Sequence, residues 1–390
     1  MHSDQATLRR PLLSWLAAGC LAVSAFGCPR HTKTSGTPGA TNELKKFSAL
    51  TAKSKERKGF FDTYQKGDDL FIAVPKARLG EKFLLHTRIA QGVGVAGLLS
   101  GMAADGRDGA IVSLERHGER LYLLQHPTRI HSPASSMLRA SVAQSYAPSV
   151  VQSATIESER ADGALVVNGK GWFLSDPSDI TSRVAALGRS PRPAVVGSPS
   201  SVSMNKERSY IDGVKGFSDN VNVRARLTFT LPERASVPSV PDERYLSLTV
   251  TYVLARLPQQ PMEPRLDDDR IGYFTTTQYD PGSRTQDAYV RTINRWRLSP
   301  SRPLTYYIDG SVPTEYRRFV ETGVQAWGRA FAAAGWPQAI RVEPLPKGAD
   351  PEDIRYPTTR WHSSADAPLG RHASLIPPPT GEIPAPSILT

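Results

Sequence analysis

The run Ile111-Val-Ser-Leu-Glu-Arg-His-Gly-Glu-Arg-Leu-Tyr-Leu-Leu-Gln125 is the clearest β-hairpin signal in the chain. Two apolar-alternating stretches, 111–116 and 120–125, flank a short polar turn that contains Gly118. Because successive side chains of a strand point to opposite faces, the alternation at Val112, Leu114 and Arg116 predicts one face on a core and the other in water.

Similar runs continue on both sides of this hairpin. Two of them lie between Phe60 and Val74 and flank the turn sequence Lys66-Gly-Asp-Asp69, which is a second hairpin signal. Further strands are expected at 82–89, 164–167, 221–231 and 245–254. Short strands separated by Gly- and Pro-rich connectors indicate an antiparallel β-rich region.

The pattern changes after about residue 295, where a helix is expected between strands. Pro303–Asp309 has the composition of a strand, and 339–342 and 354–361 predict two more. Between them Thr314 is the expected N-cap, with Glu315 in the first turn and Gly335 at the end. The helix would carry one apolar stripe at helical spacing, made of Val320, Val324, Trp327 and Phe331. We expect Trp327 and Trp336 to be core residues that pack the helix onto its sheet.

The N-terminus has the pattern of an export signal. Arg9-Arg10 precede an apolar run from Leu12 to Gly27, which is too short for a typical membrane span. The only two cysteines, Cys20 and Cys28, each follow a glycine and resemble the lipidated cysteine of bacterial lipoproteins. We expect lipidation at Cys28, with Cys20 as the alternative; an ordinary cleaved signal or an uncleaved anchor is also consistent with the run.

The composition, with 39% hydrophobic and 22% charged residues, is that of an ordinary soluble globular protein. The formal net charge is +11, but arginines are spread along the chain and no recognition motif accompanies them, so we expect no nucleic-acid partner. A basic surface resting on an anionic envelope is the simpler interpretation. If Cys28 carries the lipid, the mature chain has no second cysteine and therefore no disulfide. The expected location is the periplasmic side of a membrane or the cell surface.

The histidines and aspartates do not form a recognisable metal site. His126 and His131 lie five residues apart around Pro127, without a nearby acidic or cysteine partner, so hydrogen-bonded or surface histidines are expected rather than zinc ligands. Asp267-Asp268-Asp269 is expected to be a solvated loop, with a Ca²⁺ site as the alternative.

Four groups of motifs resemble a bacterial family of exported zinc-dependent metalloproteases. In that family a long β-rich region of unknown role precedes a metzincin-like catalytic domain. The motifs run in the family's order from about residue 58 to residue 383. They include Ser209-Tyr-Ile-Asp212, Asn220-Val-Asn-Val-Arg-Ala225, Leu254-Ala-Arg-Leu-Pro258, Asp269-Arg-Ile-Gly-Tyr-Phe274, Tyr306-Tyr-Ile-Asp309, Gly323-Val-Gln-Ala-Trp327, Asp353-Ile-Arg-Tyr356 and Thr380-Gly-Glu-Ile383.

The resemblance implies that the complete family members are zinc enzymes, but the motif that would bind zinc does not occur in this sequence. The family's zinc helix carries an H-E-x-x-H motif, in which two histidines bind the metal and the glutamate is the general base. No H-E-x-x-H occurs here, and no two of the eight histidines lie four residues apart. We therefore assign no catalytic or metal-binding residue to the chain and expect no cofactor in it.

These observations predict an α+β fold with four segments. Residues 1–28 would be the signal and lipidation site, 29–57 a flexible linker, 58–295 a β-rich domain, and 296–390 the first half of a metzincin-like α/β domain without its zinc helix. Three functions stay open: a truncated, inactive metalloprotease; a non-catalytic lipoprotein whose β-rich region binds a peptide or protein; or a chain whose catalytic half is supplied separately.

Overall fold

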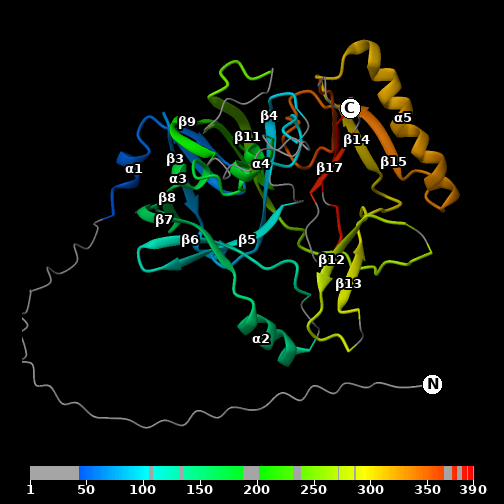
Figure 1. Cartoon of the computed structure of the whole chain (residues 1–390), viewed down its shortest axis with the longest axis horizontal. Helices are drawn as coiled ribbons and strands as arrows, with labels where there is room; N and C mark the ends of the chain where they lie inside the picture. The colour runs from blue at the N-terminus through cyan, green and yellow to red at the C-terminus, as the bar shows by residue number, and fades with distance from the viewer. Residues whose placement is uncertain are drawn as a thin grey trace, which may run out of the picture. The chain divides into compact units, whose positions relative to one another are not determined.

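The hairpin at 111–125 forms as expected and lies in the middle of a large antiparallel sheet. Val112 and Leu114 are buried in the core, and Arg116 is exposed. Each strand pairs antiparallel with its neighbours, in the order β1-β2-β3-β8-β7-β6-β5-β4-β11-β10-β9 (Figure 1). The strands are β1 (Lys55–Arg57), β2 (Asp62–Lys66), β3 (Asp69–Val74), β4 (Phe83–Gln91), β5 (Ala110–His117), β6 (Arg120–Gln125), β7 (Ser149–Glu159), β8 (Leu165–Asn168), β9 (Ser203–Gly216), β10 (Asn220–Thr230) and β11 (Tyr245–Arg256).

The computed structural model describes residues 44–95, 97–104, 109–131, 135–187, 202–231, 239–270, 272–284, 287–363, 371–375, 380–383 and 385–389. In 371–375 and 385–389 it describes only the backbone. The segment from Leu44 to Thr390 is one unit, distinct from Met1–Glu43. Cys20 and Cys28 lie outside the described residues.

The large sheet curls into a nearly closed barrel. The end of β9 returns to the start of the sheet, where the Phe60 amide donates to the Phe217 carbonyl oxygen over 2.8 Å. Two glycines make this approach possible. A Cβ atom on Gly216 would lie 2.3 Å from the Lys58 carbonyl oxygen, and one on Gly59 would lie 2.8 Å from the Phe217 nitrogen. No side chain fits at such distances, so glycine is required on both sides of this seam.

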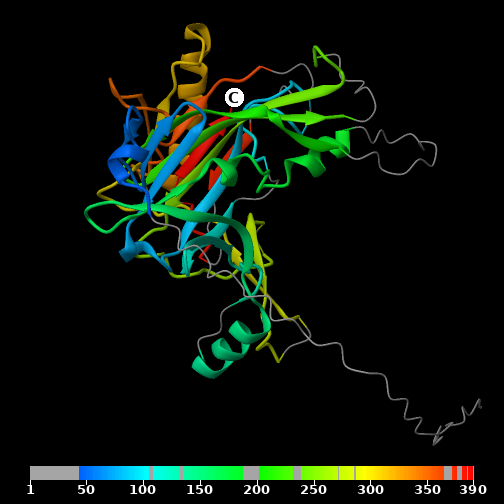
Figure 2. The same cartoon turned by 90° about the vertical axis from the view of Figure 1, so that its left-hand side faces the viewer.

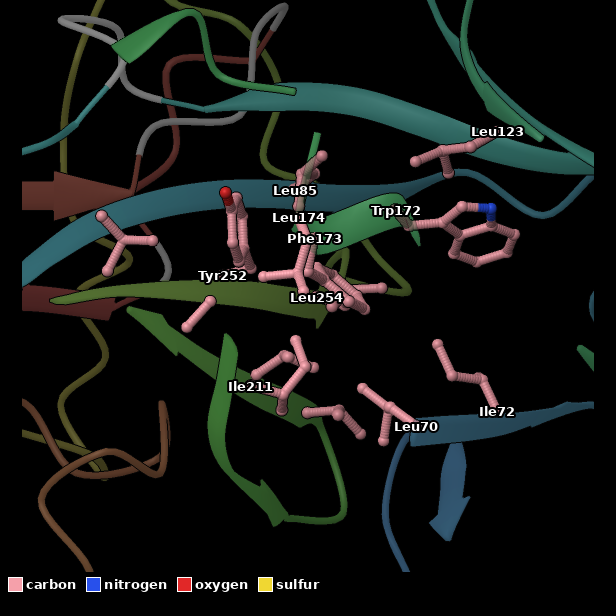
Figure 3. Packing of buried hydrophobic residues seen from close by; sticks show 14 of the residues in the cluster. Leu70, Ile72, Leu85, Leu123, Trp172, Phe173, Leu174, Ile211, Tyr252 and Leu254 are labelled. Carbon is pink, nitrogen blue, oxygen red and sulfur yellow. The ribbon is translucent and has the colours of Figure 1, made fainter. Parts of the chain in front are cut away.

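The core fills the barrel and includes two short helices between β8 and β9. Helices α3 (Lys170–Phe173) and α4 (Ile180–Leu187) supply buried residues that pack among the strand side chains. Figure 3 shows Trp172 and Phe173 beside Tyr252 and Leu254 of β11, with Leu70 and Ile72 of β3 opposite. The phenol of Tyr252 lies 5.2 Å from the ring of Phe173, centroid to centroid. The interior of the barrel is therefore a packed core.

A smaller sheet follows, in the order β15-β14-β16-β18-β17. Strand β14 pairs in parallel with β15 and β16, β16 pairs in parallel with β18, and β17 is antiparallel to β18. Helix α5 connects β14 to β15 and packs against β15. The bounds are β14 (Leu304–Ile308), α5 (Thr314–Ala333), β15 (Ile340–Pro344), β16 (Thr358–Arg360), β17 (Arg371–Leu375) and β18 (Ala385–Leu389).

The remaining elements lie at the ends of the unit. The hairpin of β12 (Thr275–Tyr279) and β13 (Tyr289–Ile293) lies on the side away from α5, as does helix α2 (Ser136–Ser145) (Figure 2). Helix α1 (Phe47–Leu50) and the 3₁₀ turn η1 (Lys76–Arg78) complete the list. Residues 44–57, expected to end a flexible linker, instead form α1 and β1. None of the helices among the described residues is long and apolar enough to cross a membrane.

The predicted α+β fold, with an incomplete metzincin-like α/β domain at its end, is wrong. The protein is mostly β, with 41% strand and 16% helix, and is dominated by the barrel-like sheet. Strands β7, β9, β12 and β13 went unpredicted because polar side chains interrupt their alternation. Strand β9, for example, has the sequence Ser-Met-Asn-Lys-Glu-Arg-Ser-Tyr-Ile-Asp-Gly-Val-Lys-Gly, in which most residues outside the core are charged or polar. The expected strand at 354–361 shortens to Thr358–Arg360.

Helix α5 forms over the predicted residues, but two of its details differ. Pro313 takes the N-cap position in place of Thr314, and no side chain caps the helix. Val324 is buried and Val320 and Phe331 are half-buried, as an inward stripe requires. Trp327, expected in the core, is 64% exposed, since among the described strands the helix makes its main contacts with β15 and these do not cover Trp327.

Candidate functional site

The candidate site lies on the outer face of strands β4, β11 and β10. The inner faces of these strands carry Leu85, Leu254, Val223 and other core residues. The alternate positions face outward and change in character along the strands. Near one end Leu84, Val253 and Ala255 form a small apolar cluster with Ile111 of the neighbouring β5. Beyond it the outward positions are polar: His86, Arg88, Asn222, Arg224 and Thr251. Period-two alternation thus separates an apolar interior from a polar outer surface.

Residues 350–362, which we call the covering segment, lie over this polar surface. Two buried asparagines of β10 hold the segment in place. The side-chain amides of Asn220 and Asn222 donate to the Glu352 carbonyl oxygen over 3.1 and 2.9 Å, and Asn220 also donates to Asn222 over 2.8 Å. The Ile354 amide donates to the Asn220 side-chain oxygen over 3.3 Å, and Ile354 packs on the apolar cluster.

Ion pairs fix the charged residues at the edge of the covering segment. Lys215 contacts Asp350 at 2.8 Å and Glu352 at 3.3 Å. Burial lowers the pKa of Lys215, but the hydrogen bonds and charges of these two carboxylates outweigh it, so the pKa is raised. The buried carboxylate of Asp353 accepts a bidentate pair of hydrogen bonds from Arg355. The carboxylates of the segment are therefore neutralised by cations.

A pocket of about 300 Å³ remains between the sheet and the covering segment. Strand β4 contributes Arg88 to its wall, and β10 contributes Asn222 and Arg224. Arg224 is paired with Asp212 at 2.8 Å. The end of the covering segment contributes the consecutive residues Arg360, Trp361 and His362. Arg360 donates to the Pro351 carbonyl oxygen, which ties the two ends of the segment together.

Arg88 is the unusual group of this pocket. Within the described residues it forms no hydrogen bond or ion pair, and its Nε atom is buried. Burial lowers the pKa of Arg88 to about 10, repulsion from Arg360 adds to the shift, and Glu352 opposes it. The side chain still carries its charge at neutral pH. A guanidinium that is partly withdrawn from water and has no anion bound to it is energetically costly, and it attracts a carboxylate or similar group.

Two histidines accompany Arg88. Burial lowers the pKa of His86 well below its usual value, and the neighbouring charge of Arg88 adds to the effect, so the ring is neutral. His362 lines the pocket with both ring nitrogens buried and without a hydrogen-bond partner among the described residues. His362 and Asn222 line the pocket and can donate or accept hydrogen bonds to a ligand next to the Arg88 charge, whereas His86 is buried and does not line it.

The residues weighed as metal ligands do not come together. His126 bonds to the Ser113 hydroxyl over 2.9 Å, which agrees with a hydrogen-bonded histidine. Asp268 pairs with Arg270 at 2.5 Å in an exposed position. In the part of the chain that the structure describes, no three His, Cys, Asp or Glu residues form a group suited to a metal ion.

The sequence carries one signal for this site, in the alternation of β4 and β10. His86-Thr-Arg88 interrupts the apolar run of β4, and Asn222 and Arg224 interrupt that of β10, each at alternate positions. Polar residues at period two within otherwise apolar strands indicate a sheet face that is covered but not part of the main core. The pairing of β4 with β11 and of β11 with β10, which brings the positions together, is not readable from either strand alone.

Comparison with known proteins gives two family matches. Residues 44–92 match a domain of unknown function, DUF5118, and residues 105–301 match a second domain of unknown function, DUF5117. The first match ends just after Gln91 of β4, and the second supplies β5 to β11, so strands from both build one barrel. No curated protein and no solved structure matches the chain. Because the second match spans half of the sequence, the chain belongs to the DUF5117 family.

Proposed function

We propose that this chain is a non-catalytic binding protein of the cell envelope that captures a peptide through a carboxylate group. The observation that carries the proposal is the charged, half-buried Arg88, whose side chain has no partner among the described residues, in a pocket of about 300 Å³. Arginine presents its N–H groups as a planar fork that matches a carboxylate in a bidentate geometry. A bound carboxylate would neutralise Arg88 and supply its missing hydrogen bonds.

The pocket wall favours an organic carboxylate over a bare ion. Val253, Ile354 and Trp361 give apolar contact, while Asn222, Thr251 and Ser311 offer hydrogen bonds at the same opening. Small-ligand pockets combine a largely apolar wall with a few polar groups that fix orientation. The free carboxyl end of a peptide, with its backbone and one side chain, has this mixture of properties.

A pair of matched peptides tests the proposal. The full chain would be titrated by calorimetry with acetyl-Ala-Ala carrying a free carboxylate, and with the same peptide as its C-terminal amide. We expect binding of the carboxylate form only. Arg88→Gln should weaken that binding by about tenfold or more, because a charge-assisted hydrogen bond contributes about 1.5–3 kcal/mol.

The control is Arg226→Gln, which removes the same charge from the same sheet face outside the pocket. It should bind the peptide as the unmodified chain does. Equal affinity for the amide and the carboxylate, or undiminished binding by Arg88→Gln, would refute the proposal.

Membrane attachment is a separate part of the proposal and rests on the N-terminal sequence. We propose that Cys28 carries a lipid that holds the protein at a membrane of the envelope. Metabolic labelling with a fatty-acid analogue should label the chain, and Cys28→Ser should abolish the label whereas Cys20→Ser should not. If Cys20→Ser abolishes the label and Cys28→Ser does not, Cys20 is the lipidated residue. If the unmodified chain takes no label, the protein is not a lipoprotein.

The relation to exported zinc metalloproteases also stays a proposal. It is supported by the order of the sequence motifs from Ser209-Tyr-Ile-Asp212 to Thr380-Gly-Glu-Ile383, and neither matched family is described as a peptidase. We propose a relative without peptidase activity, since the sequence has no H-E-x-x-H. Incubation of the purified chain with zinc and a mixture of unfolded proteins should give no cleavage. Cleavage that a chelator stops would overturn this proposal.

A further inference from the structure

A row of aromatic side chains, half-buried at Trp361 and exposed beyond it, begins at the wall of the pocket. Trp361 lines the pocket and stacks on Tyr316 of helix α5, with ring centroids 4.9 Å apart and planes inclined by 13°. Phe319 follows three residues later on the helix. Residues three apart are neighbours on a helix surface, so the row continues from Tyr316 to Phe319. We call Trp361, Tyr316 and Phe319 the aromatic shelf.

The backbone positions the shelf relative to the pocket. The Trp361 amide donates to the Ser311 hydroxyl over 3.1 Å, and the Ser311 amide donates to the Asp309 carboxylate over 2.8 Å. The Asp309 amide donates to the Thr359 carbonyl oxygen over 3.0 Å. Ser311 and Asp309 line the pocket themselves. One hydrogen-bonded corner therefore links the pocket wall to the start of α5.

The shelf exposes more aromatic surface than a solvated helix face requires. Tyr316 is 45% exposed and Phe319 is 57% exposed. The guanidinium of Arg318 lies over the Phe319 ring, 4.5 Å from its centroid, and so covers one face of it. Aromatic side chains that stay exposed beside a polar pocket are typical of binding surfaces, where they supply most of the affinity.

We propose that the aromatic shelf is the subsite for an aromatic side chain at the carboxyl end of the bound peptide. This inference rests on the proposed carboxylate site and adds the identity of the neighbouring side chain. The shelf is continuous with the pocket, because Trp361 belongs to both. The group bound on the shelf should therefore be the part of the peptide next to its carboxylate. A carboxylate held at Arg88 leaves the terminal side chain next to a flat pair of rings. Such a surface is complementary to another aromatic ring.

Two peptides that differ in the last side chain test the inference. The full chain would be titrated with acetyl-Ala-Phe and with acetyl-Ala-Ala, both as free carboxylates. We expect the phenylalanine peptide to bind about tenfold more tightly, because it buries a large aromatic side chain. Tyr316→Ser should remove most of that preference, so that it binds the two peptides with nearly equal affinity. Phe319→Ser, at a more exposed position, should reduce the preference as well.

The matched control is Trp327→Ser, which removes an equally exposed aromatic residue from the same helix, far along from the pocket. It should keep the full preference. If the unmodified chain binds both peptides equally, the shelf is not a subsite for an aromatic side chain, and the proposed carboxylate site still stands. Loss of preference in Trp327→Ser would also overturn it. If neither peptide binds, the carboxylate site itself is refuted.

Discussion

The two faces of strands β4, β11 and β10 are stabilised in different ways, and each places its own constraint on the side chains. The inner face packs Phe83, Tyr252 and Val223 into the barrel core, where volume and shape decide stability. The outer face carries Arg88 and Asn222 under the covering segment, where each polar atom needs a partner. The comparison teaches that one set of strands can hold the fold on one side and line a polar pocket on the other.

The largest effect should come from the inner face. Phe83 is almost fully buried, and its ring lies 5.8 and 5.4 Å from those of Phe60 and Phe61. Phe83→Ala should lower the free energy of unfolding by about 3–5 kcal/mol, through lost burial and the cavity left behind. Urea denaturation followed by tryptophan fluorescence measures it. Tyr210→Ala, at a position 42% exposed, should change stability by about 0.5 kcal/mol or less.

On the outer face, Asn222→Ala should have the next largest effect. It removes the hydrogen bonds to Asn220 and to the Glu352 carbonyl oxygen, and leaves Asn220 as the only β10 side chain that donates to that carbonyl. We expect a loss of about 2 kcal/mol. The covering segment should also become sensitive to limited proteolysis while the barrel stays resistant. An unchanged cleavage pattern would show that the asparagines do not hold the segment.

A smaller effect, of opposite sign, is expected back in the core. The Tyr252 hydroxyl is buried and has no hydrogen-bond partner among the described residues. Tyr252→Phe should therefore raise the free energy of unfolding by about 1 kcal/mol, since an unsatisfied polar group is removed. Tyr64→Phe is the matched control, because that hydroxyl bonds to Glu56 and Arg160. Tyr64→Phe should destabilise the protein. Identical changes for both substitutions would contradict the interpretation that the Tyr252 hydroxyl lacks a hydrogen bond.

The smallest effect concerns pH and the ion pairs of Lys215. Its pKa is raised in the folded chain, so the interaction contributes its full stability below the unfolded value of 10.5. The contribution is then lost as pH rises through the folded pKa. Lys215→Met should show a weaker fall in stability above pH 10.5 than the unmodified chain. Thermal unfolding across that pH range measures the difference. If the stability of both proteins falls in parallel with pH, the Lys215 ion pairs are not a source of the pH dependence.

Much of the secondary structure was readable from the sequence, but the architecture was not. The hairpins at 62–74 and 110–125 were predictable because the turn glycines and the alternation agree locally. The closure of the barrel was not, since it depends on backbones at Gly59 and Gly216 that are distant in sequence. For the same reason the site was missed: Arg88 and Asn222 meet only through pairing with β11.

The boundary between the two matched families also has a structural explanation. Strand β4, at the end of the first match, hydrogen-bonds to β5 and β11 of the second. Arg88 comes from the first match, Asn222 comes from the second, and the covering segment lies in neither. The two sequence families thus describe parts of one sheet, and the pocket requires both.

The glycine seam between Gly59 and Gly216 has a consequence for behaviour at high concentration. A sheet that closes on itself hides the backbone edges that would otherwise recruit another chain. A branched side chain at Gly216, as in Gly216→Val, would force the Lys58 carbonyl away and disrupt the nearby hydrogen bond from Phe60 to Phe217 that joins the two ends of the sheet. The seam therefore helps to prevent association between the sheet edges of separate copies of this β-rich chain.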